Sequence, residues 1–362
     1  MGLAPYGEAI YVDLLREVHG AISLTNLGNK DSQDEFISQT IAKLENAGLS
    51  RAKEFYEFDK LSQRTKRVPE LLKQHHDLAA SVQKYLEEEL LSLVLRAKEM
   101  TGSSNLCMAG GVAMNCVANS IVENSGIFQN IHLQPACEDN GIAIGSALAH
   151  QGEQVEFQSP YLGPAFNDDE IAKILSLNGI VSELSDDISE DAAHLLAEGN
   201  IIGWFQGGLE YGPRALGNRS IIAHPTIKGM HKKVSAAKRR ELWRPFGPSV
   251  LNKSGPMLFD NFVPSPYMLR SFSVKPEWRE KLTAVVHVDG STRPQTVTDS
   301  SNPRYYKLIS NFAKLTGIPA ILNTSFNDDR EPIVCTPDDA LKTFYTTGLD
   351  VLVLGNRIVR KK

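Results

Sequence analysis

The sequence of 362 residues contains no apolar run near the twenty residues that a membrane-spanning helix needs. Its cysteines are few, namely Cys107, Cys116, Cys137 and Cys335, and they show no CxxC spacing. This usage excludes a dense disulfide framework and fits reduced thiols in a cytosol. What the sequence does contain is 42% hydrophobic residues, enough to bury a large core, and a length that favours two domains.

Residues 203 to 225 combine a run of glycines with two arginines directly after an apolar strand, which we expect at Ile201–Phe205. No Lys-Ser or Lys-Thr follows these glycines, and G-x-G-x-x-G is absent, so the stretch is not one of the common phosphate-loop motifs. Glycines let backbone amides approach a ligand, and the guanidinium groups of Arg214 and Arg219 match the geometry of phosphate or carboxylate. The pattern predicts an anion-binding loop. A glycine-rich turn with surface salt bridges is the alternative.

Positive charge is concentrated from Arg214 to Arg244, in a protein whose formal net charge is −5. This window holds nine basic residues, Arg214, Arg219, Lys228, Lys232, Lys233, Lys238, Arg239, Arg240 and Arg244, against the single acid Glu241. A local positive field attracts small anions. Because the whole chain is acidic, with a pI near 6.0, and the window has few aromatic residues, we expect a small phosphate and not a nucleic acid.

The first half of the chain is expected to have a long amphipathic helix over residues 71–100, followed by a buried strand at Asn105–Met108. Gly110 and Gly111 make a turn, and a helix over 112–123 follows. Such a strand, turn and helix N-terminus offer free amides to an anion or nucleotide. A plain Gly-Gly turn is the alternative reading of the same residues.

A second strand is expected at Ile131–Leu133, before a helix over 142–150 that Glu138, Asp139, Asn140 and Gly141 open. Asp139 is suited to cap this helix, which is the usual role of aspartate at such a position. It could equally serve as a metal-binding carboxylate. Spacing alone does not favour either role.

The second half begins near residue 155, and its expected helices cover 168–177, 189–197, 304–315 and the segment after Pro337. Its expected strands cover 201–205, 284–288, 319–322, 350–354 and 357–359. Asn218 and Ser220 are suited to orient phosphate oxygens, although turn formation explains such residues equally well. Arg293 is a further anion ligand, whereas Lys232, Lys233 and Arg239 are expected to be solvated.

The segments MGLAPYG, MAGGVAMNCVAN and EDNGIAIGSALAH resemble the C-terminal lobe of the actin-like (ribonuclease H-like) first domain of NodU-type O-carbamoyltransferases. GGLEYGPRALGNRSI, KRRELWRPFGPSVL, HVDGSTRPQTV and NTSFNDDREPIVCTPDDAL resemble their C-terminal YrdC-like domain, a twisted-sheet α/β fold. The resemblance therefore implies an α/β protein with a partial actin-like carbamoyl-transfer domain at 1–155 and a carbamoyl-adenylate-forming domain at 156–362. Its substrates are carbamoyl phosphate and ATP with Mg²⁺, and its acceptor is a hydroxyl group of unknown identity.

The resemblance also assigns residues. It implies a catalytic role for Arg214, Arg219, Lys238, Arg240, Arg244 and Arg293. It implies substrate or nucleotide binding by Gly110, Gly111, Asn115, Asn140, Gly141, Asn218, Ser220, Asn323, Thr324 and Ser325. A plain turn is the alternative for the last three.

One departure from the family concerns the iron or similar divalent metal of the transfer domain. Family members carry an actin-like first lobe, with two metal-binding histidines, before the MGLAPYG segment at which this sequence starts. Of the family's ligands only Asp139 is matched, and one carboxylate is a poor metal site. We expect either a separate polypeptide that supplies the lobe or a loss of transfer.

Two other classes stay open at this stage. An enzyme of tRNA threonylcarbamoylation shares both folds but starts from threonine and bicarbonate. A non-catalytic nucleotide-binding remnant is the third alternative.

Overall fold

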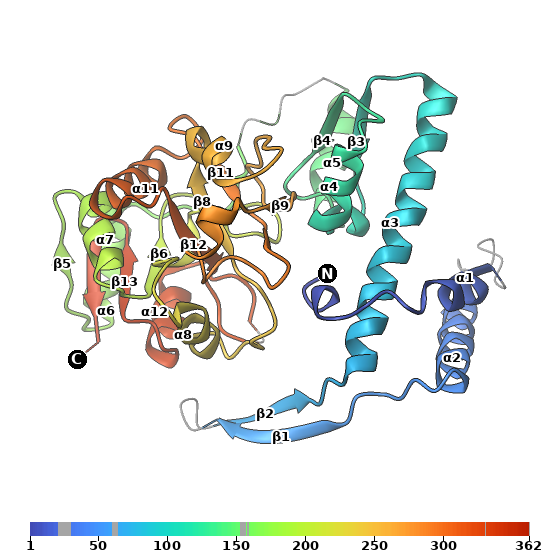
Figure 1. Cartoon of the computed structure of the whole chain (residues 1–362). Helices are drawn as coiled ribbons and strands as arrows, with labels where there is room; N and C mark the ends of the chain where they lie inside the picture. Colours follow the sequence, from blue (N-terminus) through green and yellow to red (C-terminus); the bar gives the residue numbers. More distant parts are fainter. Residues whose placement is uncertain (21–29, 60–63, 153–156, 158, 330, 362) are drawn as a thin grey trace. The chain divides into compact units, whose positions relative to one another are not determined.

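The computed structural model describes residues 1–20, 30–59, 64–152, 157, 159–329 and 331–361. The chain forms two compact units, one from Met1–Gly102 with Asn124–Ile127 and the other from Ser103–Glu123 with Phe128–Lys362 (Figure 1). Among the described residues, every helix is too short or too polar to cross a membrane.

The first unit is built on one long helix. Its elements are η1 (Ala4–Tyr6), α1 (Val12–Gly20), α2 (Lys30–Asn46), the antiparallel hairpin β1 (Glu54–Asp59) and β2 (Arg64–Pro69), and α3 (Lys73–Thr101). The structure confirms the long helix expected over 71–100. The chain start is fixed to it by the buried Asp77, which accepts the amide of Glu8 at 2.9 Å, and by Ser81, which accepts the amide of Tyr11 at 2.9 Å.

The second unit contains a small parallel sheet near its start. Its elements are β3 (Asn105–Met108), η3 (Gly111–Met114), α4 (Cys116–Asn124), β4 (Asn130–Leu133) and α5 (Gly141–Gln151). The strand at 105–108 is confirmed, but it is not buried, since Asn105 and Cys107 are exposed. The helix expected over 112–123 is divided, because Asn115 has an extended backbone (ψ 91°) and its side-chain oxygen accepts the amide of Ala118.

An eight-stranded mixed sheet forms the centre of the second unit, in the order β11-β8-β12-β7-β6-β13-β14-β5. The strands are β5 (Glu183–Leu184), β6 (Ile202–Phe205), β7 (Arg219–Ala223), β8 (Gly247–Leu251), β11 (Gln295–Val297), β12 (Ala320–Ser325), β13 (Val351–Leu354) and β14 (Arg357–Arg360). β6 pairs antiparallel with β7 and parallel with β13, and β12 pairs antiparallel with both β7 and β8.

Helices cover both faces of this sheet. They are α6 (Asp168–Leu177), α7 (Ile188–Ala197), α8 (Met230–Ala237), α11 (Pro303–Thr316) and α12 (Pro337–Thr346). Side chains alternate along the strands, so that Phe205 and Leu352 pack with α6, α8 and α12, while Trp204 and Val353 pack with α7 and α11. The mixed α/β fold class is as predicted.

Shorter elements lie beside the large sheet. They are η4 (Asn252–Ser254), α9 (Gly255–Leu258), β9 (Phe272–Ser273), α10 (Pro276–Arg279) and β10 (Ser291–Thr292). The strand predicted at 284–288 is wrong, since these residues form turns, and the apolar side chains of Ala284 and Val285 are buried without strand pairing. An apolar run alone does not separate a strand from a buried turn.

Candidate functional site

The loop between β6 and β7 is closed at its base by the side chain of Arg219. This residue is fully buried, and its guanidinium lies 3.6 Å from the ring centroid of Phe205. It donates to the carbonyls of Gln206 at 2.6 Å, Asn218 at 3.2 Å and Pro164 at 3.0 Å. Burial lowers the pKa of Arg219 to about 10. Sequence reasoning expected Arg219 to bind a ligand, but both of its terminal nitrogens donate to protein carbonyls, and only its Nε is buried without a partner among the described residues.

A buried carboxylate completes the base of this loop. One oxygen of Glu210, which is 5% exposed, accepts the amides of Leu216, Asn218 and Arg219 at 2.7 to 3.0 Å. Glu210 therefore occupies the anion-binding concavity that the backbone amides make. The sequence analysis missed Glu210 because it considered only the positively charged residues of this region. Its position among glycines, in a loop that ends in an arginine, is the signal that could have indicated it.

Two other predicted ligands, Asn218 and Ser220, also hold the loop. The side chain of Asn218 donates to the carbonyl of Gly208 at 2.7 Å and accepts from Asn302 at 3.0 Å. Ser220 is fully buried and accepts the amide of Gly217 at 3.1 Å. The contacts favour turn formation, which was the alternative for both residues.

The tip of the loop reaches the small parallel sheet. Tyr211 donates its hydroxyl to the carbonyl of Asn140. Gly212 has a φ of 114°, and a Cβ there would lie 2.7 Å from the carbonyl oxygen of Pro135, so only glycine fits without strain. These contacts at Tyr211 and Gly212 place the backbone next to Arg214 close to the loop that follows β4.

Arg214 belongs to a group of five cationic side chains from three segments, which we call the cation cluster: Arg214, Lys238, Arg240, Arg244 and Arg293. Burial and the nearby Arg293 lower the pKa of Arg214 to about 10. Burial, followed by Arg244, Arg293 and Arg214, lowers the pKa of Arg240 to about 9. Mutual repulsion of this kind requires the groups to lie close together. The structure thus brings together segments separated by about eighty residues in the sequence.

Donors of this cluster are left without protein partners. Within the described part of the chain, the Nε atoms of Arg214 and Arg240 are buried and make no hydrogen bond. The guanidinium of Arg240 lies 4.8 Å from the ring centroid of Phe246, which forms a wall beside it. Buried donors without partners are costly, and an oxyanion would satisfy them.

Lys238 is at the edge of the cluster, buried against the end of β12. Its ammonium group donates to the carbonyl and hydroxyl of Ser325 and to the side-chain oxygen of Asn327 at 2.8 Å. These oxygens favour the charged form, but burial and the nearby arginines have the larger effect and lower the pKa of Lys238 to about 7. Ser325 therefore contacts a member of the cluster.

The two residues before Ser325 are buried in the sheet. Asn323 donates its side-chain amide to Ser249 at 2.8 Å and Gln295 at 3.1 Å, and it is 2% exposed. Thr324 is also buried, opposite Ile221 in β7. These contacts give both residues a role in holding the sheet.

The glycine turns of the small sheet lie together at the carboxyl ends of its strands. The amide of Gly110 donates to the carbonyl of Cys137 at 2.6 Å, which ties the turn after β3 to the loop after β4. A Cβ at Gly141 would lie 2.2 Å from the carbonyl oxygen of Ala136. Gly111 and Asn140 are exposed at this edge, the place where α/β sheets bind ligands. Asn115, in contrast, caps α4.

Asp139 is exposed at the same edge, and its side chain makes no helix cap, because the N-cap residue is Asn140 and no side chain caps α5. Within the ranges given above, His, Cys, Asp and Glu nowhere gather in a group of three that could hold a metal ion. These residues therefore do not fit the family's transfer metal.

Arg239 contradicts the expectation that it is solvated. Its guanidinium pairs with Asp328 at 2.7 Å, and only 14% of its side chain and 10% of that of Asp328 are exposed. Lys232 and Lys233 are exposed, as expected.

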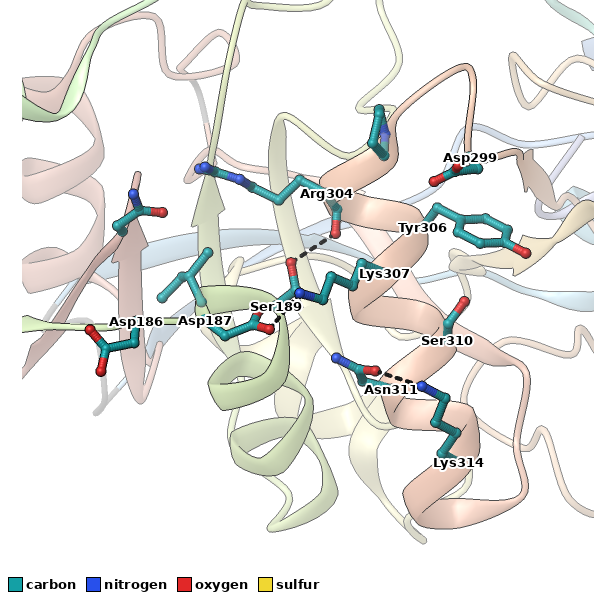
Figure 2. Close-up of a pocket in the computed structure, with 13 residues that line it drawn as sticks. Asp186, Asp187, Ser189, Asp299, Arg304, Tyr306, Lys307, Ser310, Asn311 and Lys314 are labelled. Atoms are coloured by element: carbon teal, nitrogen blue, oxygen red, sulfur yellow. Dashed lines mark hydrogen bonds and ion pairs between the residues drawn. The ribbon is translucent and has the colours of Figure 1, made fainter.

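A separate depression of about 640 Å³ lies between the start of α7 and α11 (Figure 2). Lys307 and Asp187 form an ion pair in it at 2.5 Å, and Ser189 donates to the carbonyl of Arg304 at 3.0 Å. Figure 2 shows none of the cation cluster among the labelled residues that line it. This depression is not the anion site.

Comparison with known families agrees with the resemblance seen in the motifs. Residues 1–148 match the carbamoyltransferase N-terminus, and residues 193–361 match the carbamoyltransferase C-terminus. Because the two matches together cover most of the sequence, the chain belongs to the carbamoyltransferase family.

Similar proteins are longer than this chain. It is 41% identical to an uncharacterised protein of Synechocystis sp., 39% to nodulation protein NolNO of Sinorhizobium fredii and 37% to nodulation protein NolO of Bradyrhizobium diazoefficiens. Each alignment covers all of the chain but only 63%, 52% and 65% of the respective relative. The chain thus spans between about half and two-thirds of the length of these relatives.

Among solved structures, full-length HypF in its phosphate- and nucleotide-bound form matches 51% of this chain and 23% of its own, with a TM-score of 0.36 and 20% identity. Sua5 of P. abyssi matches 46% of this chain and 45% of its own, with a TM-score of 0.33 and 13% identity.

Proposed function

We propose that this chain forms carbamoyl adenylate from carbamoyl phosphate and ATP, and that the activated carbamoyl group then passes to a hydroxyl of a small-molecule or sugar acceptor. The observation that carries the proposal is the cation cluster, whose buried donors have no partners in the described residues. Membership of the carbamoyltransferase family supports the choice of substrate.

The cluster suits a reaction between two phosphate compounds. Water cleaves the P–O bond of carbamoyl phosphate to give carbamate and inorganic phosphate, and a carbamate oxygen then attacks the α-phosphorus of ATP while pyrophosphate leaves. Both steps place negative charge on phosphate oxygens, and fixed guanidinium groups offset that charge. The side chains of Arg214, Arg240 and Arg293 are placed to do so, with Lys238 and Arg244 beside them. In this proposal no covalent nucleophile is needed.

Arg219 has a different role in the proposal, since both of its terminal nitrogens already donate to protein carbonyls. It shapes the loop that carries Arg214, together with Glu210. The loops at the carboxyl ends of β3 and β4 lie next to the tip of this loop, and we assign acceptor or nucleotide contacts to Gly110, Gly111 and Asn140. The division near residue 155 and the separate polypeptide that completes the transfer half stay predictions.

The test is pyrophosphate release from ATP by the purified chain. Release that depends on carbamoyl phosphate supports the proposal. Release that instead depends on threonine and bicarbonate would identify a threonylcarbamoyl-forming enzyme. Calorimetric binding of ATP and carbamoyl phosphate without any release would identify a binding protein and overturn the proposal.

A further inference from the structure

Helix α8 ends with an arginine where glycine is usual. The amide of Arg240 donates to the carbonyl of Ser235 at 2.9 Å and the amide of Arg239 to that of Ala236 at 3.1 Å, which is the Schellman pattern of a helix end. Arg239 therefore takes the left-handed position, with a φ of 50°. Glycine prefers this position because it has no Cβ. A larger residue persists there only when its surroundings hold it.

Two contacts of the side chain hold Arg239. Its guanidinium bonds to the carboxylate of Asp328 at 2.7 Å and to the carbonyl of Thr346, in α12, at 2.8 Å. Asp328 is fixed in turn, because its amide donates to Glu331 at 2.7 Å, and the same oxygen of Glu331 accepts the hydroxyl of Thr343 at 2.6 Å. The end of α8 is thus fastened to the loop after β12 and, through it, to α12.

The residues on either side of Arg239 are members of the cation cluster. Lys238 contacts Ser325 and Asn327 at the end of β12, whereas Arg240 contacts Pro245 and the ring of Phe246. The left-handed residue reverses the chain between these two contacts. Any change in its φ would move the ammonium of Lys238 and the guanidinium of Arg240 relative to each other.

We propose that Arg239 and Asp328 are a positioning pair, which fastens the reversed chain at the end of α8 to the loop after β12 and so sets the spacing of Lys238 and Arg240 in the anion site. The inference rests on the proposed function for its substrate, but the pair itself is defined by the contacts above. Neither residue touches the substrate in this proposal. Glycine would suffice for the helix end itself, so we assign the ion pair to fixing the residues on either side of Arg239.

The test is the double variant Arg239→Gly/Asp328→Asn, which removes both charges and gives the left-handed position its preferred residue. We expect its melting temperature to stay close to that of the parent, because relief at the left-handed position offsets the lost ion pair. We expect its affinity for inorganic phosphate, measured by calorimetry, to fall on the order of tenfold, with a similar rise in KM for carbamoyl phosphate, since small misplacements of charged groups are costly. Arg239→Lys, which keeps the charge beside Asp328, should recover part of the affinity.

Two controls separate the pair from general effects. Glu123→Gln/Arg270→Met removes another ion pair of the same unit, at 2.8 Å with 23% of the Glu123 side chain and 13% of the Arg270 side chain exposed. It brings no relief at a left-handed residue, so it should lower stability while phosphate affinity is kept. Asn261→Gly changes another left-handed residue, which is exposed, and should alter neither.

Unchanged phosphate affinity in the double variant would overturn the positioning role, as would a loss of affinity that only follows a loss of melting temperature. A parent protein that binds phosphate but releases no pyrophosphate would refute the proposed function. The role of the Arg239–Asp328 pair would then still be tested by comparing the phosphate affinities of the double variant and the parent. A parent that binds no phosphate would overturn both.

Discussion

The base and the tip of the β6–β7 loop each carry an arginine, and the two differ in what their terminal nitrogens contact. At the base, Arg219 is fully buried with donors bound to loop carbonyls, and Glu210 binds the loop amides. At the tip, Arg214 lies near Arg293, and its guanidinium makes no hydrogen bond to the described residues, whereas in Arg219 only the Nε is without a partner. The same residue type therefore builds the loop at one end and faces the anion site at the other. The hydrogen-bond acceptors around each arginine distinguish the two roles, and the sequence motif does not.

The largest expected effect breaks the base of the loop. Arg219→Ala leaves buried carbonyls without donors and Glu210 without a nearby compensating charge, and should lower the free energy of unfolding by about 3 to 5 kcal/mol. The shift in the urea midpoint measures this loss. If the Arg219→Ala protein instead kept the parental stability and lost its phosphate affinity, Arg219 would be a ligand of the anion.

The next largest effect is expected from a substitution at the tip of the β6–β7 loop. Arg214→Ala removes one of several repelling cations, so stability should be kept or slightly raised. The value of kcat/KM for pyrophosphate release should fall by a factor that corresponds to a loss of about 3 kcal/mol of transition-state stabilisation. Steady-state assays and thermal melts of one preparation measure both. Lys232→Ala, which removes an exposed charge from the same basic window, is the matched control and should alter neither. Equal losses in the two variants would mean that only net charge matters.

The smallest effect is one of pH, because Lys238 at the edge of the site titrates near neutrality, whereas Arg214 at the tip and Arg219 at the base do not. The pKa of Lys238 is lowered to about 7 from the ordinary value of 10.5, so the unfolded chain binds more protons than the folded chain between these values. Stability of the free protein should therefore rise with pH across this window. A bound dianion favours charged Lys238, so affinity should fall over the same window.

Sulfate suits this measurement, since it stays doubly charged throughout. Its affinity should fall by about tenfold from pH 6.5 to 8.5, with proton uptake seen as a dependence of the calorimetric heat on the buffer. Lys238→Met should remove most of this dependence. An affinity that does not change with pH in the parent would show that Lys238 stays charged.

Sequence reasoning predicted elements whose signal is local and missed those decided by contacts far along the chain. The helices at 168–177 and 71–100 follow from periodicity and caps, and Asn167 does cap α6 by accepting the amide of Glu170. The strand β7 was missed because Arg219, a charged residue, begins it in full burial. Burial of that kind depends on carbonyls contributed by distant segments such as Pro164.

The candidate site shows the same limit. The basic window predicted that Arg214, Lys238 and Arg240 belong to one region, because they are near in sequence and alike in charge. It gave no means of separating Arg219 from Arg214, nor of pairing Arg239 with Asp328, which lies 89 residues further along the chain. Whether the donors of an arginine are free depends on the residues that the fold brings around it, and the sequence motif does not show these.

Residues 103–151 share a core with the chain beyond them, and this affects how the protein can be divided for study. Leu269 packs with Leu133, Ala113 and Cys137, and its carbonyl accepts the side-chain amide of Asn119 at 2.9 Å. A fragment that starts near residue 156 would expose this apolar surface to water and leave the carbonyl of Leu269 without its donor. A fragment that starts at residue 103 keeps these contacts, and is therefore the better starting point for crystallising the second unit.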